Sequence, residues 1–349
     1  MKRYNNLFGK LCSIENIALA HEKAKKGKAH YREVKRVDRD SKRCFEFIRQ
    51  QLLSKTFKTA PYIEMIKNEY GKNRIIHKLP YFPDRIVHHA IVQVAGGIWR
   101  KTLIRDTYAC VRGRGIHDGL RRIKAALKDF EGTRYCLKMD VEKFYASMDH
   151  DVLKATIRRK IKDADFLDII DEVIDSSPGE VGVPIGNYLS QFFGNLYFSG
   201  FDHFMKEICG CRHYFRYCDD IVILDGDKDR LHQLREQTQS YWQQNLKLNL
   251  KANWQVFPVD SRGIDFLGYR FFHGYILLRK MIAKKFKQKM RRIEAGWQKM
   301  QPVSIASSIM SYNGWLKHAN CHNLKTRHID KKLQGILNLA LLEMKIGGI

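Results

Sequence analysis

The chain has 349 residues, of which 44% are hydrophobic, and its 63 Lys and Arg against 37 Asp and Glu give a formal net charge of +26. At about 150 residues per domain this length predicts two or three compact units, and the apolar fraction excludes a wholly disordered chain. The charge is extreme for an enzyme of small molecules and indicates a polyanionic partner, either nucleic acid or an anionic membrane surface. No apolar run approaches the roughly 20 residues of a membrane-spanning helix, so we expect no membrane association.

Eight cysteines are scattered along the sequence, and the basic N-terminus lacks the continuous apolar stretch of a signal peptide. Together these features favour a reducing compartment, and we expect the protein to be cytoplasmic. The closest pair, Cys209 and Cys211, is separated by one residue, which is too short for the usual spacing of zinc ligands. The cysteines are therefore predicted to be structural or incidental.

The first half of the chain alternates between basic helical and strand-like segments. The expected elements are basic helices up to about residue 60, strand-like pieces over 61–78, an amphipathic helix over about 83–102, and a strand over 134–141. Gly71 gives a turn signal inside the strand-like segment. The strand ends at Asp140, and Asp149 has the position of an N-cap before a helix at about 150–162.

The second half predicts a hairpin between helices. The expected elements are an apolar helix over about 188–207, strands at 214–217 and 221–224, a polar helix over about 228–246, two short strands around 263–269, and basic helices from about 280. Cys218, Asp219 and Asp220 would then lie at the hairpin tip. This order of elements predicts an α+β domain with a helical tail.

Acidic residues at strand ends are unusual in so basic a protein, and Asp140, Asp219 and Asp220 have such positions. Packed together, these carboxylates would repel and raise at least one pKa unless a cation neutralised them. Hard divalent ions such as Mg²⁺ bind carboxylate oxygens and keep positions for substrate phosphates. Two such ions about 4 Å apart can activate an attacking hydroxyl and stabilise a leaving oxygen. Separate, solvated turn aspartates are the alternative interpretation.

Four motifs occur in a fixed order: Asp140-Val-Glu-Lys-Phe-Tyr145, Gly186-Asn-Tyr-Leu-Ser-Gln191, Tyr217-Cys-Asp-Asp220 and Gly263-Ile-Asp-Phe-Leu-Gly-Tyr269. With the upstream Arg74-Ile-Ile-His-Lys-Leu-Pro80, this succession resembles the reverse transcriptase family over most of the chain. The resemblance implies a right-hand polymerase of the α+β class, with fingers, a palm containing an antiparallel sheet, and a helical thumb. We expect a basic helical N-terminal extension at 1–60, fingers at 61–130, a palm at 131–275 with a fingers insertion at about 150–182, and a thumb at 276–349.

Most bacterial members read Gln-Gly-x-x-x-Ser-Pro where this chain has Ile185-Gly-Asn-Tyr-Leu-Ser-Gln191. This variant resembles the reverse transcriptases of diversity-generating retroelements. That resemblance implies cDNA synthesis from a template RNA, error-prone at template adenines, for mutagenic retrohoming, and a small basic oligomeric accessory variability protein as partner. The alternatives are a retron, group II intron-like or defence-associated reverse transcriptase, or a non-catalytic RNA-binding scaffold.

The resemblance also assigns roles to individual residues. It implies that Asp140, Val141, Asp219 and Asp220 hold two Mg²⁺ ions, for which Mn²⁺ can substitute. Tyr145 matches the steric gate that excludes a ribose 2′-hydroxyl. Contacts to the dNTP are expected from Arg74, Lys72, Tyr145, Ile185, Gly186 and Gln191. Contacts to template RNA and the RNA–cDNA duplex are expected from Arg112, Arg114, Ser190, Lys284, Lys285, Arg291 and Arg292. No general acid is assigned, because Trp254 stands where the family usually has a lysine and Lys251 comes three residues early.

Overall fold

The computed structural model describes residues 3–69, 72–177, 179–329 and 331–346. The chain divides into two compact units. The first unit comprises Met1–Arg114, Lys138–Ile221 and His232–Trp254, and the second comprises Gly115–Leu137, Val222–Leu231 and Gln255–Ile349. The division into N-terminal extension, fingers, palm and thumb stays a prediction. No helix in the described ranges is long and apolar enough to cross a membrane.

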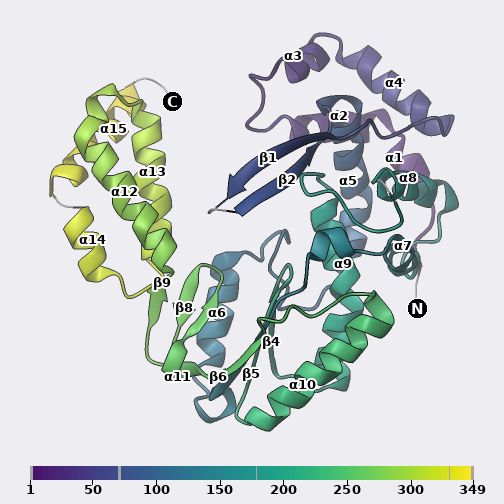
Figure 1. The fold of residues 1–349 in the computed structure, drawn as a ribbon. Helices are drawn as coiled ribbons and strands as arrows, with labels where there is room; N and C mark the ends of the chain where they lie inside the picture. The colour runs from purple at the N-terminus through teal and green to yellow at the C-terminus, as the bar shows by residue number, and fades with distance from the viewer. Residues whose placement is uncertain (1–2, 70–71, 178, 330, 347–349) are drawn as a thin grey trace. The chain divides into compact units, whose positions relative to one another are not determined.

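The N-terminal segment is helical, as predicted, with α1 (Phe8–Leu11), α2 (Ile14–Ala24), α3 (Arg32–Arg39) and α4 (Ser41–Leu53) (Figure 1). The side chain of Ser13 caps α2 by accepting from the Asn16 N–H at 3.2 Å. Helix α2 buries Ile17, Ala20 and Ala24 and packs against α5 (Ile86–Arg100). The ammonium of Lys23, in α2, donates to Gln93 Oε1 of α5 at 2.7 Å beside this apolar contact.

The predicted strand-like segment is an antiparallel hairpin of β1 (Ile63–Glu69) and β2 (Lys72–Lys78), which Figure 1 shows as two long arrows. Lys67 lies opposite Arg74, and Met65 lies opposite Ile76. Because side chains alternate along a strand, these four residues share one face. The turn predicted at Gly71 lies outside the described residues.

A four-stranded sheet in the order β4-β5-β3-β6 positions the predicted acidic residues. Its strands are β3 (Tyr135–Met139), β4 (His213–Tyr217), β5 (Asp220–Asp225) and β6 (Gln255–Pro258). Strand β3 ends one residue before Asp140, and its neighbour β5 begins at Asp220. The strands and hairpin predicted from the alternation of residues are confirmed, and so is the α+β class.

Helices of the first unit supply the apolar contacts beneath this hairpin. They are α7 (His150–Arg158), α8 (Ala164–Asp175), α9 (Ser190–His203), the π-helical segment Phe204–Ile208, and the end of α10 (Lys228–Tyr241) with its π-helical extension Trp242–Leu246. Phe198 and Phe201 of α9 contact Trp242 with ring centroids 5.6 and 5.5 Å apart. Asp149 accepts from the Val152 N–H at 2.9 Å, so the N-cap predicted for α7 is confirmed.

The second unit contains the three-stranded sheet β7-β8-β9 and a group of helices. Its elements include α6 (Ile116–Ala126), α11 (Val259–Arg262), β7 (Ile264–Phe266), β8 (Tyr269–Phe271), β9 (Ile276–Leu278), α12 (Lys280–Gly296), α13 (Pro302–Leu316), α14 (His322–His328) and α15 (Lys331–Ile346). Gly268 has a φ of 85°, and a Cβ there would lie 2.6 Å from the Trp315 ring, so this turn between β7 and β8 requires glycine.

Candidate active site

The predicted carboxylates converge at one end of the four-stranded sheet. Asp140 follows β3, and Asp219 and Asp220 lie where β4 turns into β5. A further segment runs beside Asp140: the Lys251 N–H donates to the Asp140 carbonyl at 3.1 Å, and Val141 forms an antiparallel bridge with Leu250. The backbone of three segments therefore defines where these side chains lie.

Each carboxylate has a different counter-charge. The Lys251 ammonium donates to Asp140 Oδ2 at 2.9 Å. The Lys138 ammonium lies 3.5 Å from Asp220 Oδ1, yet this buried oxygen has no hydrogen-bond partner. The charge of Arg74 lowers the pKa of Asp219 but is outweighed there by opposing effects. Sequence reasoning left Lys251 without a role, whereas the structure places its amine on the first carboxylate.

Burial and mutual repulsion make this cluster difficult to ionise. Burial, aided by the neighbouring charge of Asp140, raises the pKa of Asp219 to about 6. Burial also raises the pKa of Asp220 to about 7, against the attraction of Lys138. Carboxylates with raised pKa values are stabilised in their charged form by a cation placed among them. The cluster therefore has a deficit of positive charge.

The donor set fits a hard divalent cation. Within the described ranges, no group of three or more His, Cys, Asp or Glu side chains has the arrangement of a metal site. Asp140 and Asp219 nevertheless interact strongly by charge, and the buried Asp220 Oδ1 is an acceptor without a hydrogen bond. Carboxylate oxygens are the ligands that Mg²⁺ prefers, and it keeps further positions for water and phosphate. Asp140 and Asp219 are the residues that would hold it.

Tyr145 lies beside the hairpin tip, in the 3₁₀-helix Phe144–Ser147. Its hydroxyl is 3.2 Å from Cys218 Sγ, and burial raises its pKa well above the ordinary value. The phenol is therefore neutral at any physiological pH. Gly194 lets α9 approach closely, since a Cβ there would lie 3.1 Å from the Phe144 ring and 3.4 Å from the Tyr145 ring. This packing holds the ring next to the carboxylates.

The segment predicted to lie beneath the nucleotide is bound to β2. The His77 N–H donates to the Ile185 carbonyl at 2.7 Å. Gly186 has a φ of 115°, and a Cβ there would lie 2.5 Å from the His77 carbonyl oxygen and 2.9 Å from Ile76 Cγ2. Only glycine fits this contact. The strand that carries Arg74 is thus joined by its backbone to the residues of the second motif.

The polar residues of this segment have partners within the protein. The buried Ser190 hydroxyl donates to the Pro184 carbonyl at 2.7 Å, an internal bond that sequence reasoning did not foresee for a predicted nucleic-acid contact. Gln191 Oε1 accepts from the Cys110 thiol at 2.9 Å. The Ile185 side chain is 36% exposed. Gln191 is exposed as well, so Ile185 and Gln191 are accessible to a ligand, whereas Ser190 is buried.

The predicted basic contacts of the first unit differ in their surroundings. The Arg114 guanidinium donates to the Ile104 carbonyl at 2.6 Å, and this bond joins the two ends of the loop between these residues. Exposed Arg112 lines a cavity of about 420 Å³, together with Tyr188 and other residues. In that cavity His89 stacks on Tyr188 with ring centroids 3.9 Å apart, and burial lowers the pKa of His89 to about 4, so the imidazole is neutral. The Lys72 side chain lies outside the described residues.

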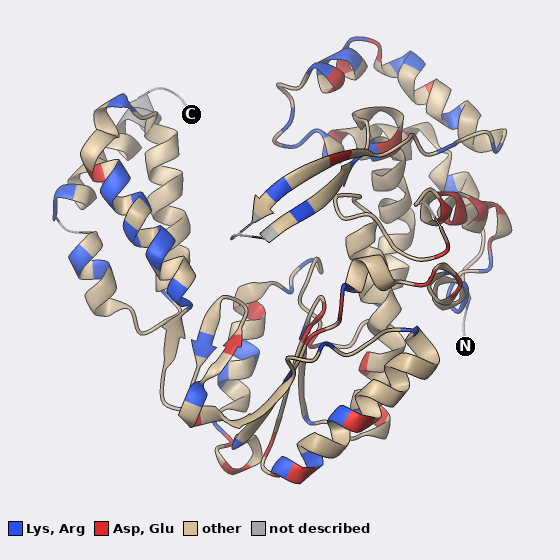
Figure 2. Cartoon of the chain, in the orientation of Figure 1, with Lys and Arg blue, Asp and Glu red and all other residues tan. Residues whose placement is uncertain are grey.

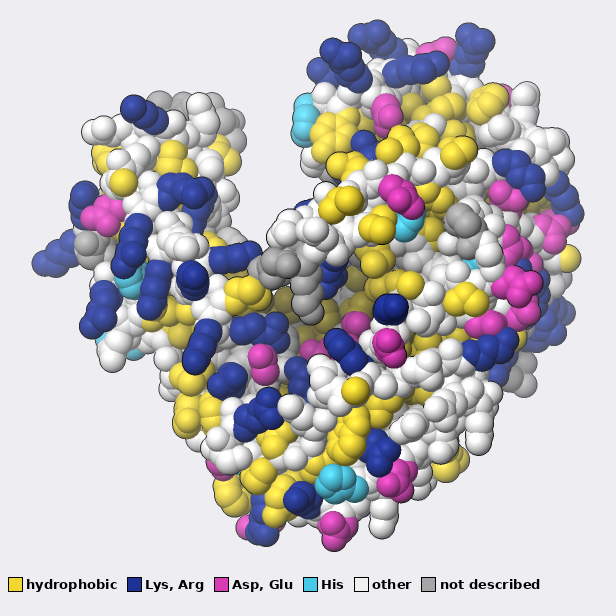
Figure 3. All heavy atoms as spheres, viewed as in Figure 1, with side chains coloured by type: hydrophobic (Ala, Val, Ile, Leu, Met, Phe, Trp, Pro, Cys, Tyr) yellow, Lys and Arg dark blue, Asp and Glu magenta, His cyan; other side chains and the backbone are white. Residues whose placement is uncertain are grey.

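The predicted duplex-binding residues are exposed on one helix of the second unit. Helix α12 buries Phe286, Met290 and Ile293 on its other face. Figure 2 marks the many Lys and Arg positions along this helix in blue, and Figure 3 shows Lys and Arg side chains gathered on its surface. The predicted contacts Lys284, Lys285, Arg291 and Arg292 are all exposed. Helical periodicity thus separates a packing face from a cationic one. Such a face suits the phosphates of a nucleic acid.

The family model described as reverse transcriptase (RNA-dependent DNA polymerase) matches residues 66–271, more than half of the chain. The chain belongs to this family. The matched range contains Asp140, Asp219, Asp220, Tyr145 and Arg74. The expectation of a reverse transcriptase fold and of an RNA-directed DNA polymerase is thereby confirmed at the level of the family.

Curated relatives include intron-encoded proteins. Protein YkfC of Escherichia coli is 25% identical over 268 residues, which cover 64% of this chain and 70% of the relative. The group II intron-encoded protein LtrA of Lactococcus lactis subsp. cremoris is 24% identical over 261 residues, which cover 55% of this chain and 43% of LtrA. The relatives of this chain thus include a bacterial protein encoded by a group II intron.

Solved structures agree with the right-hand polymerase fold. The structure of apo telomerase from Candida tropicalis superimposes with a TM-score of 0.50 at 12% identity, over 83% of this chain. The chain spans 58% of that telomerase chain. A likeness at this identity concerns the fold alone, and it confirms the predicted class.

Proposed function

We propose that this reverse transcriptase extends a primer on an RNA template, by attack of the primer 3′-hydroxyl on the α-phosphate of a dNTP. The new bond joins the 3′-oxygen to the α-phosphorus, the bond to the bridging oxygen breaks, and pyrophosphate leaves. Bound Mg²⁺ or Mn²⁺ ions, two of them in our proposal, would supply charge neutralisation and Lewis acidity. The observation that supports this function is the convergence of Asp140, Asp219 and Asp220 with raised pKa values.

The surrounding residues fit the binding of a dNTP. Arg74 stands on the hairpin joined to the Ile185–Gly186 backbone, and its charge reaches Asp219. A guanidinium in this place suits the triphosphate. Tyr145 offers a neutral, closely packed ring beside the carboxylates, which suits the exclusion of a 2′-hydroxyl. Basic α12 suits the phosphates of the RNA–cDNA duplex.

Primer extension with the Asp219→Asn variant tests this proposal. The assay contains a primed RNA template, Mg²⁺ and dNTPs, and the matched control is Asp225→Asn at the other end of β5. We expect extension to fall at least about 10³-fold in Asp219→Asn, since the lost charge stabilisation is several kcal/mol. The control should extend normally. Equal extension by the wild type and Asp219→Asn would refute the proposed site.

We further propose that synthesis is error-prone at template adenines and serves mutagenic retrohoming in a diversity-generating retroelement, with a small basic accessory variability protein as partner in the cytoplasm. The aliphatic residue at 185 supports this proposal, because it provides no hydrogen bond near the nascent base pair. Its backbone is held by His77, so a substitution changes the side chain alone.

The error spectrum of Ile185→Gln is the matching experiment. Sequenced cDNA from the wild type should carry errors concentrated at template adenines, and Ile185→Gln should reduce them, whereas Ile185→Leu should not. An unchanged spectrum in Ile185→Gln would contradict the role of this side chain. Accurate synthesis by the wild type would instead favour a group II intron-like enzyme, which the similarity to LtrA supports as the second candidate.

A further inference from the structure

A fully buried ion pair lies beside the hairpin that carries Asp219. Arg216 of β4 and Asp202 of α9 both have no exposed side-chain surface. The guanidinium donates to both carboxylate oxygens, from Nε to Oδ1 at 2.7 Å and from Nη2 to Oδ2 at 2.6 Å. Apolar residues of similar volume often replace such a pair without loss of stability. Stability alone therefore does not explain its presence.

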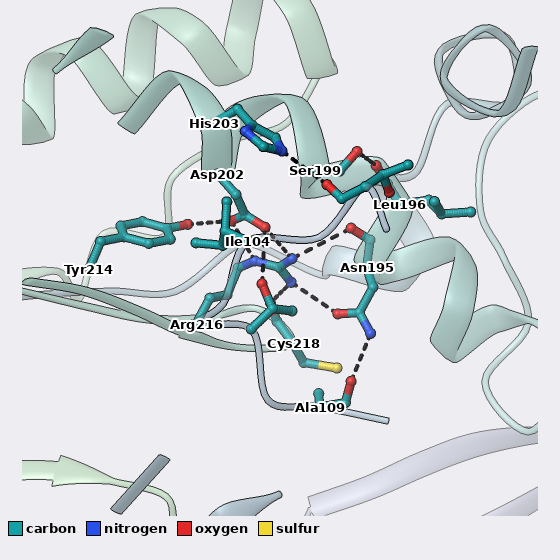
Figure 4. A network of polar contacts seen from close by, with 12 residues as sticks. Ile104, Ala109, Asn195, Leu196, Ser199, Asp202, His203, Tyr214, Arg216 and Cys218 are labelled. Atoms are coloured by element: carbon teal, nitrogen blue, oxygen red, sulfur yellow. Dashed lines mark hydrogen bonds and ion pairs between the residues drawn. The ribbon is translucent and has the colours of Figure 1, made fainter. Parts of the chain in front are cut away.

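The other donors of Arg216 bind the hairpin tip and α9, as Figure 4 shows. Nη1 donates to the Cys218 carbonyl at 3.0 Å and to Asn195 Oδ1 at 3.3 Å, and Nη2 reaches the Asn195 carbonyl at 3.5 Å. All five N–H bonds of the guanidinium thus have an acceptor. The Cys218 carbonyl belongs to the peptide that leads into Asp219, so Arg216 fixes the orientation of that peptide.

This peptide is in a conformation that needs support. Cys218 has a φ of 56°, in the left-handed region that costs a non-glycine residue about 1 kcal/mol or more. It is held on one side by Arg216 and on the other by Tyr145, whose hydroxyl is 3.2 Å from its sulfur. The Asn195 side chain also donates to the Ala109 carbonyl at 2.7 Å, so the loop that contains Ala109 belongs to the same hydrogen-bond network.

We propose that Arg216 is a positioning residue for nucleotidyl transfer. It fixes the Cys218–Asp219 peptide so that the Asp219 carboxylate faces Asp140, while Asp202 holds the guanidinium. This inference rests on the proposed function of the carboxylates and adds a role for two residues that touch neither substrate nor metal. Lysine is no substitute at 216, since one ammonium nitrogen does not span the positions of Nε, Nη1 and Nη2.

The double variant Arg216→Met, Asp202→Leu separates positioning from stability. Asp202 also accepts from the buried Tyr214 hydroxyl at 2.7 Å, and this donor loses its acceptor in the double variant, so Tm should fall by the effect of about 1–3 kcal/mol. All assays are therefore run well below the Tm of the variant. The extension rate at saturating dNTP should fall about 30-fold or more, with KM for dNTP changing less than about threefold. In the metal-free protein, hydrogen exchange should accelerate at residues 217–220 and not in β1 and β2. Mn²⁺ binding followed by electron paramagnetic resonance should weaken about tenfold.

A matched control removes another ion pair of the same unit. Arg158 and Asp171 join α7 to α8, and Arg158→Met, Asp171→Leu should leave the extension rate, the hairpin exchange and Mn²⁺ binding unchanged. Wild-type rate and wild-type hairpin exchange in Arg216→Met, Asp202→Leu would overturn the proposal.

If that double variant does not fold, the single variant Arg216→Lys tests the proposal with the same measurements. A slower rate with faster hairpin exchange supports the proposal, and wild-type values of both overturn it. Hairpin exchange is measured without substrate or metal, so it reports on positioning even if Asp219→Asn proves active and the proposed function fails.

Discussion

Two charged clusters lie close together in the first unit, and they are built in opposite ways. Arg216 and Asp202 form a closed pair, in which every guanidinium N–H has an acceptor and neither side chain meets solvent. The cluster of Asp140, Asp219 and Asp220 is open: one of its buried oxygens has no hydrogen bond, and two of its carboxyls have raised pKa values.

The difference separates structural charge from charge kept for a ligand. Burial lowers the pKa of Arg216, but Asp202 outweighs this effect and raises it, so the pair stays ionised and rigid. In the open cluster, Lys138 and Lys251 offset only part of the negative charge, and the pKa values of Asp219 and Asp220 stay raised. A bound cation would supply the remaining compensation. Variants that remove one charge from each cluster should therefore have opposite effects on the stability of the metal-free protein.

The largest effect on stability is expected for Asp202→Asn. This change leaves the buried guanidinium of Arg216 without its counter-charge, which costs about 3–5 kcal/mol of unfolding free energy. Urea unfolding followed by tryptophan fluorescence measures the loss. The control Asp175→Asn removes an exposed partner of Lys154, 2.6 Å away, and should cost less than about 1 kcal/mol. Equal losses of unfolding free energy in the two variants would show that the buried pair contributes no more to stability than an exposed one.

The open cluster should respond in the other direction, and with pH. Because the folded-state pKa of Asp219 is raised to about 6, its protonated form is favoured by folding, and this contribution is lost as pH rises from about 4 through 6. Asp219→Asn should thus stabilise the metal-free protein at pH 8 by about 1–3 kcal/mol, since one pKa unit equals about 1.4 kcal/mol.

The pH series supplies the internal control for this prediction. The stabilisation by Asp219→Asn should shrink to about 0.5 kcal/mol near pH 4, where the wild-type carboxyl is protonated in the folded state and about half protonated in the unfolded state. Added Mg²⁺ should reduce it at pH 8, because the ion stabilises the wild-type carboxylate. Thermal unfolding at pH 4, 6 and 8 measures both. A variant that is less stable than the wild type at pH 8 without metal would contradict an unneutralised cluster.

Removal of the Lys251 counter-charge is expected to have a smaller effect, on metal binding by the open cluster. Its ammonium bonds Asp140 Oδ2 and therefore competes with a divalent ion for that oxygen. The pair is partly exposed, and such pairs contribute about 0–1 kcal/mol. Lys251→Met should accordingly tighten Mn²⁺ binding in the absence of dNTP by up to about fivefold. The control is Lys247→Met, which removes a partner of Asp149 and should leave Mn²⁺ binding unchanged. Weaker Mn²⁺ binding in Lys251→Met would contradict competition and show that Lys251 supports metal binding.

The open cluster could be predicted from the sequence, but the closed pair could not. Asp140 and Asp219 stand at the ends of locally recognisable strands, and strand ends are readable from alternation and turn residues. Strand β4 is buried on both faces at Tyr214, Phe215 and Arg216. The alternation of apolar and polar residues therefore does not show on which face the Arg216 side chain lies. Asp202, the single acidic residue in the largely buried helix α9, was the available signal, because a buried carboxylate requires a cationic partner.

The contact of Lys251 with Asp140 was missed for another reason. The two residues are 111 positions apart, and they meet because a segment outside the sheet runs antiparallel to the residues after β3. No local pattern encodes such a pairing. The binding of Ile185 to β2 is of the same kind, since it depends on tertiary contact rather than on propensity.

The smallest change tests how the two clusters are connected, through Cys218 and Tyr145. Tyr145→Phe removes the hydroxyl next to the thiol but keeps the ring, and a thiol contact is a weak hydrogen bond. We expect less than about 1 kcal/mol of lost stability and unchanged discrimination between dNTP and NTP. Tyr145→Val removes the ring and should relax this discrimination at least about tenfold if the ring is the steric gate. Competition assays with labelled dNTP and NTP measure this discrimination. If Tyr145→Phe relaxes it as well, discrimination depends on the hydroxyl and on the position of the hairpin, and not on the volume of the ring.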